Sequence, residues 1–149
     1  MELLIIISVG FAIFAYITID SFFYYKMLKK LKEERIKNGI TSKMFFHYFL
    51  EKGVDEKFCQ VVYEDFQKWV ESIGNFPIMP LDNIFKIYRI ADETLDDAIL
   101  EILARYQNIP VKNVDVTNIP EATIQTIDDL VMALWKQANS QPGKAKPAK

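Results

Sequence analysis

The chain has 149 residues, half of them hydrophobic, and a formal net charge of −2, which fits one folded domain with additional segments. A single cysteine, Cys59, excludes an internal disulfide and a zinc site built from several cysteines. Charge is unevenly distributed, because residues 1–40 carry six Lys/Arg against four Asp/Glu, whereas residues 41–137 carry nine against sixteen, a net charge of −7. An acidic domain repels phosphates, so no nucleic-acid partner is expected.

The N-terminal residues 1–25 predict a transmembrane anchor. Residues 3–19 contain no charged side chain, and the SFFYY sequence after Asp20 extends the apolar character to Tyr25. A membrane-spanning helix needs about 20 apolar residues, so residues 3–25 are expected to contact lipid, with Asp20 at the interface. A cleaved signal peptide is the alternative interpretation, which the lack of a basic start and of a small-residue cleavage site disfavours. A functional acid within the membrane is the alternative role for Asp20.

Residues 26–40 predict a basic juxtamembrane helix that continues the anchor and stops at Asn38-Gly39. Six basic side chains follow the apolar segment: Lys26, Lys29, Lys30, Lys32, Arg35 and Lys37. An excess of positive charge marks the cytoplasmic side of a membrane segment. We therefore expect a single-pass membrane protein whose C-terminal domain is cytoplasmic, at the inner membrane if the source is bacterial.

Residues 41–137 predict an all-helical domain. A helix over residues 42–52 has Thr41 or Ser42 as its cap, and a longer helix with apolar residues at helical spacing runs from Asp55 to Gly74. The proline-containing sequence NFPIMP predicts a loop, and LDNIFKIYRI after it a short helix.

The remaining segments complete the predicted domain. After a helix that starts near residue 94, residues 108–122 predict a loop with a short helical turn, and a last helix begins near Thr126. Because helices joined by short loops bury their apolar sides on one another, the domain is expected to be a small bundle. The sequence ANSQPGKAKPAK, residues 138–149, predicts a disordered tail.

The sequence ADETLDDAIL, residues 91–100, opens the acidic helix of this domain. Five carboxylates surround its start: Asp92, Glu93, Asp96, Asp97 and Glu101. Negative charge near a helix N-terminus is stabilised by the helix dipole, and this structural role alone explains the cluster. The functional alternative is a docking face for a basic protein partner.

Few residues in the chain suggest catalysis. The one histidine, His47, and the one cysteine, Cys59, fall in different predicted helices, and five glycines form no phosphate-binding loop. We expect His47 at the surface or its boundary and Cys59 as a packing residue. No catalytic residue and no metal site are predicted, so the protein is not expected to be an enzyme.

The order of these elements over residues 55–135 resembles the acyl carrier protein superfamily. The helix ending at Gly74, the long loop after it, and the TIDDLVMAL sequence of the last helix are similar to the family pattern. Glu93-Thr94-Leu95 stands where the family has the Asp-Ser-Leu triplet that opens its second helix. The resemblance implies that the domain is a small antiparallel helical bundle. The predicted transmembrane helix precedes it in the chain.

Two features depart from the family pattern. Residues 111–125 are longer than the family's short third helix, and Thr94 replaces the serine that carries phosphopantetheine. Certain divergent carrier-like bacterial domains also lack that serine and have an acidic pair before an alanine, as Asp96-Asp97-Ala98 does here. Thr94 is expected to be the helix N-cap, with Asp97 completing an imperfect capping box.

The resulting functional hypothesis is a membrane-tethered, non-catalytic protein-interaction module that needs no cofactor and docks a basic partner through the acidic helix. The alternative is a true carrier that bears phosphopantetheine on Thr94 and serves a membrane-bound acyl transfer system. A third possibility is a helical bundle unrelated to carriers.

Overall fold

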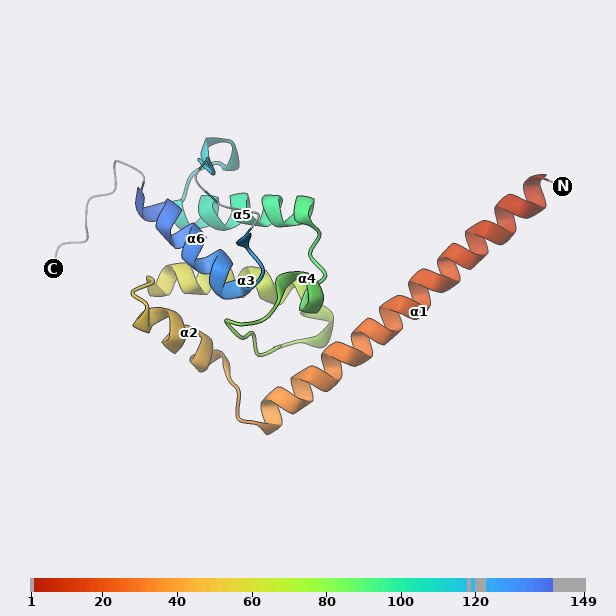
Figure 1. Cartoon of the computed structure of the whole chain (residues 1–149), viewed down its shortest axis with the longest axis horizontal. Helices are drawn as coiled ribbons and strands as arrows, with labels where there is room; N and C mark the ends of the chain where they lie inside the picture. Colours follow the sequence, from red (N-terminus) through yellow and green to blue (C-terminus); the bar gives the residue numbers. More distant parts are fainter. Residues whose placement is uncertain (1, 118, 120–122, 141–149) are drawn as a thin grey trace. The chain divides into compact units, whose positions relative to one another are not determined.

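The structure is a computed structural model that describes residues 2–117, 119 and 123–140, with side chains from residue 6 onward (Figure 1). The chain divides into two compact units, Met1–Gly39 and Ile40–Lys149. The described residues are helices joined by loops, apart from one isolated antiparallel bridge between Asn83 and Thr126. The predicted all-helical class is therefore confirmed for this part of the chain.

The first unit is a single helix, α1 (Glu2–Lys37), of 36 residues. At 1.5 Å per residue it is about 54 Å long, which exceeds the roughly 30 Å hydrocarbon core of a bilayer. By length and composition α1 can cross a membrane. Its basic end continues the apolar segment without a break, and the chain leaves the helix at Gly39, whose φ is 73°. The predicted stop at Asn38-Gly39 is confirmed.

In the second unit, α2 (Ser42–Glu51) is followed by α3 (Glu56–Trp69). Thr41 occupies the N-cap of α2 without a side-chain capping bond, whereas Asp55 caps α3 by accepting the Phe58 N–H at 3.1 Å. The prediction that α3 continues to Gly74 is wrong. The α-helix ends at Trp69, and a 3₁₀ turn, η1 (Glu71–Ile73), leads to Gly74.

The loop after Gly74 leads to α4 (Ile84–Ile87), which Asn83 caps. This loop is also bonded to the start of the last helix. The Ile84 N–H donates to the Gln125 carbonyl at 3.0 Å, and the Ile127 N–H donates to the Asp82 carbonyl at 3.1 Å. Segments more than 40 residues apart in the sequence therefore meet at the bridge.

The acidic helix is α5 (Asp92–Gln107), and a 3₁₀ turn, η2 (Val111–Asn113), follows it. The last helix, α6 (Ile127–Ser140), begins at the predicted place. A capping box forms there, because Thr126 Oγ1 accepts the Asp129 N–H at 3.2 Å and the Asp129 carboxylate accepts the Thr126 N–H at 2.9 Å.

The predicted boundary of the C-terminal tail has to be corrected. Residues 138–140 are the last turn of α6, and Ala138 is buried with 1% of its surface exposed. The cause is packing, because Gln137 and Ala138 are both buried and extend the buried side of the helix past the expected end. The rest of the predicted tail, residues 141–149, lies outside the described residues.

The core of the second unit forms around α3, which packs against α2, α5 and α6 (Figure 1). Phe58 is fully buried, and its ring centroid lies 5.0 Å from that of Tyr106 and 5.4 Å from that of Trp135. Cys59 is buried beside it, and burial raises the pKa of its thiol to about 11. The thiol is therefore protonated at neutral pH and acts as a packing group. His47 is exposed, with its Nε2 3.1 Å from Glu51 Oε1.

Candidate interaction surface

The structure corrects the predicted start of α5. Ala91 is the N-cap residue, and Thr94 is the third residue of the helix, with its N–H bonded to the Ala91 carbonyl at 3.0 Å. Thr94 is therefore not the cap, and no capping box joins it to Asp97. The turn before the helix decides this, because Arg89 has a φ of 53° and Ile90 is buried, so helical backbone begins at Asp92.

The five carboxylates of the predicted cluster are all exposed on α5, and we call them the acidic face: Asp92, Glu93, Asp96, Asp97 and Glu101. The opposite side of the helix is buried in the core through Leu95, Ile99 and Ile102. Because residues four apart lie on the same side of a helix, Glu93, Asp97 and Glu101 form one row and Asp92 and Asp96 another.

A groove of about 390 Å³ lies between α3 and the part of α5 that carries Asp97 and Glu101, and we call it the α3–α5 groove. Its lining residues from α3 are Asp65, Lys68 and Trp69, and those from α5 are Thr94, Asp97, Ala98 and Glu101. Trp69 and Ala98 provide apolar surface, whereas Asp97 and Glu101 provide negative charge. The other three carboxylates of the acidic face, Asp92, Glu93 and Asp96, are not among the lining residues.

The carboxylates of α3 are neutralised by cations. Asp65 is buried, and its Oδ1 lies 2.7 Å from Lys68 Nζ and 3.6 Å from Arg105 Nη1. Arg105 also bonds Glu64, with Nη2 and Oε2 2.6 Å apart. Bonds from Gln60 and Arg105 lower the pKa of Glu64.

The carboxylates of α5 differ in this respect. Within the part of the chain that the structure describes, no ion pair involves Asp97 or Glu101. The α5 side of the groove is therefore left with uncompensated negative charge at its edge. A partner that supplied the missing cation would remove the repulsion between these two carboxylates.

The sequence did not indicate Asp65, Lys68, Trp69 or Arg105 as residues of the interaction surface. The sequence does indicate that Asp65 is buried, because it lies three residues after Val62 and four after Val61, within the apolar pattern of α3. A charged residue on the buried side of a helix requires a partner. Sequence alone does not name that partner, since Arg105 lies forty residues further along the chain.

A second buried carboxylate, Asp82, has a structural role. Its Oδ2 accepts the Met79 N–H at 2.9 Å and the Tyr88 hydroxyl at 2.8 Å, and 4% of the residue surface is exposed. The Tyr88 ring in turn packs on Phe66, with centroids 5.0 Å apart. Asp82 thus holds the loop before α4 against α3.

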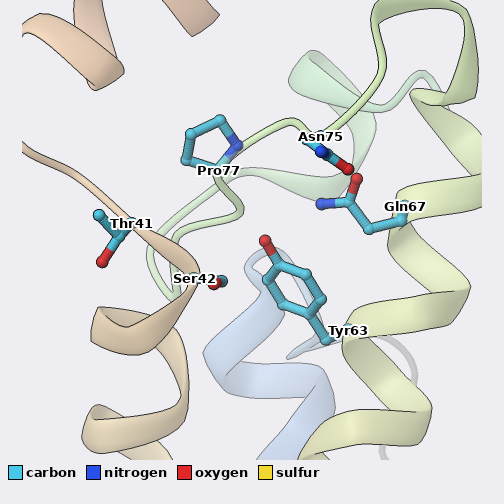
Figure 2. A pocket seen from close by; sticks show the side chains of 6 residues that line it. All are labelled: Thr41, Ser42, Tyr63, Gln67, Asn75 and Pro77. Atoms are coloured by element: carbon cyan, nitrogen blue, oxygen red, sulfur yellow. The ribbon is translucent and has the colours of Figure 1, made fainter.

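Another pocket, of about 430 Å³, lies where the start of α2, α3 and the loop after Gly74 meet (Figure 2). Its lining carries hydroxyls, amides and one proline, without a charged group: Thr41, Ser42, Tyr63, Gln67, Asn75 and Pro77. Gln67 bonds both the N–H and the carbonyl of Phe76, so its amide is used to hold the loop. Burial raises the pKa of the Tyr63 hydroxyl, which keeps it neutral.

Among the described residues, no group of three or more His, Cys, Asp or Glu side chains could hold a metal ion. No family model, curated protein or solved structure matches this chain. In the described residues, the acidic face and the α3–α5 groove combine exposure, negative charge and apolar surface at one place.

Proposed function

We propose that the protein is a membrane-tethered, non-catalytic interaction module with an acyl-carrier-like fold, which docks a basic protein partner at the cytoplasmic membrane face. The observation that carries this proposal is the contrast between α3, whose Glu64 and Asp65 are paired with cations, and α5, whose Asp97 and Glu101 are not. Complementary charge across an interface accelerates encounter and excludes wrong partners. The dipole of α5 stabilises Asp92 and Glu93 in its first turn, whereas Asp97 and Glu101 lie beyond that turn.

The tether supports the same proposal. Residues 3–25 of α1 would lie in lipid, and the basic residues 26–37 would face the cytoplasmic leaflet, whose anionic lipids attract them. The acidic second unit is repelled by that surface. Its acidic face would then remain available to a protein partner, at a local concentration raised by the anchor.

Charge reversal on the acidic face tests the proposal. We expect Asp96→Lys/Asp97→Lys to lower partner recovery about tenfold in a pull-down of the detergent-solubilised full chain. Each exposed ion pair contributes roughly 0.2–1 kcal/mol, reversal adds repulsion to that loss, and 1.4 kcal/mol corresponds to about tenfold in affinity.

The matched control is Glu56→Lys/Glu71→Lys, which changes net charge equally at two exposed positions that are not on α5. Its recovery should stay close to that of the unmodified protein. If both pairs of substitutions leave recovery unchanged, the acidic face is not the docking surface.

A second candidate function, a true phosphopantetheine carrier, is favoured by one observation. Thr94 is half-exposed and lines the α3–α5 groove, and it is not the residue that caps the helix. A prosthetic group attached to this residue would lie at the α3–α5 groove. The methyl group of threonine crowds that hydroxyl, which favours the interaction module over the carrier.

Intact-mass spectrometry after co-expression with a phosphopantetheinyl transferase separates the two functions. We expect no added mass on the unmodified chain. Thr94→Ser is the matched variant, because it restores the residue that carriers use, and Thr94→Ala removes the hydroxyl. An added mass on the unmodified chain that disappears in Thr94→Ala would establish the carrier function and overturn the non-catalytic module.

A further inference from the structure

The size of the α3–α5 groove limits what it can hold. Binding sites for small molecules are typically about 300–1,000 Å³, and at about 390 Å³ this groove lies near the lower end. Two of its lining residues, Asp97 and Glu101, are exposed carboxylates. These dimensions suit one side chain of a partner better than a whole cofactor.

The lining of the groove specifies the chemistry of that side chain. Trp69 and Ala98 offer apolar surface to a methylene chain, and Asp97 and Glu101 offer two carboxylates to its end. Lysine and arginine bury their aliphatic stems while keeping the charged group at a polar edge. A tryptophan ring also attracts a cation placed over its face. Lys68 does not fill this role, because its Nζ lies 2.7 Å from the buried Asp65.

We propose that the α3–α5 groove is the specificity site of the docking surface and takes one lysine or arginine side chain from the partner. This inference rests on the proposed function. It divides the acidic face into two parts. Asp97 and Glu101 bind the inserted cation at the groove, whereas Asp92, Glu93 and Asp96 lie outside it and contribute only longer-range attraction.

The fluorescence of Trp69 gives a local readout of occupancy. The chain has two tryptophans, so Trp135→Phe leaves Trp69 as the single emitter in the full chain in detergent. The probe is a synthetic amphipathic helical peptide with one central arginine, compared with the same peptide carrying glutamine there. We expect saturable change of Trp69 emission with the arginine peptide, and at least tenfold weaker binding of the glutamine peptide.

Two pairs of substitutions with equal charge change test which carboxylates act. We expect Asp97→Asn/Glu101→Gln to weaken binding of the arginine peptide at least tenfold, and Asp92→Asn/Asp96→Asn to weaken it less than threefold. Far-ultraviolet circular dichroism of both variants controls for folding. Saturable binding of the arginine peptide without change in Trp69 emission would overturn the inference.

Other outcomes separate the inference from the proposed function. Equal weakening by both pairs would make the acidic face a diffuse docking surface and overturn the groove as specificity site. No weakening by either pair would contradict both the inference and the acidic face. A Trp69 emission that depends on protein concentration without peptide would assign the groove to a second copy of this chain, which also overturns the inference.

Discussion

Replacement of Asp82 by alanine is expected to lower the free energy of unfolding of the second unit by about 3–5 kcal/mol. The Asp82 carboxylate accepts hydrogen bonds from the Met79 N–H and the Tyr88 hydroxyl in a buried setting. Hydrogen bonds to a charged group contribute about 1.5–3 kcal/mol each, and a buried donor left without a partner is costly. The loop before α4 would lose its attachment to α3 in the variant.

Denaturant unfolding of the full chain in detergent, followed by near-ultraviolet circular dichroism, measures this loss. Tyr88→Phe removes one donor and keeps the ring on Phe66, so it should cost about 1.5–3 kcal/mol. Leu81→Ala, next to Asp82 but with the leucine 73% exposed, should stay within about 0.5 kcal/mol. If Asp82→Ala costs less than Leu81→Ala, the two hydrogen bonds do not hold the loop.

Replacement of Phe58 by alanine is expected to cost about 3–5 kcal/mol, the usual loss for a buried phenylalanine. Its ring joins three helices, because it lies on α3 and contacts Tyr106 of α5 and Trp135 of α6. Both contacts are between ring centroids about 5 Å apart, a spacing that favours aromatic pairs. A cavity at this position would loosen α5 and α6 together.

The same unfolding measurement, with tryptophan emission as a second probe, checks this expectation. Phe58→Leu keeps apolar volume at the site and should cost clearly less than Phe58→Ala. Met44→Ala, at a position 48% exposed on α2, is the control outside the core. An unfolding free energy that is unchanged in Phe58→Ala would show that the ring does not connect the helices as the structure indicates.

The two carboxylates that matter for stability and those proposed for function differ in their surroundings. Asp65 and Asp82 are buried and have hydrogen-bond or ion-pair partners from their own unit. Asp97 and Glu101 are exposed beside apolar surface. Burial of a carboxylate without a partner is unfavourable, so Asp65 and Asp82 need partners within the unit. Exposure leaves Asp97 and Glu101 able to bind a cation from another molecule.

The elements that depend on local chemistry could be predicted from the residues alone. The uncharged N-terminal segment and the basic residues after it predicted one long helix, and α1 has the length and composition for crossing a membrane. Asp55 and Thr126 were placed correctly at helix starts, because a short polar side chain that satisfies nearby N–H groups acts within four residues of itself.

The features that depend on residues distant in the sequence could be seen only in the tertiary structure. Thr94 lies inside α5 because the turn at Arg89 and the burial of Ile90 set the start of that helix. The end of α6 follows the packing of Ala138, not the composition of the tail. The α3–α5 groove and the pairing of Asp65 with Arg105 arise because two helices that are distant in sequence pack side by side. Local residue patterns carry no information about that distance in space, so the groove appears only once the bundle has formed.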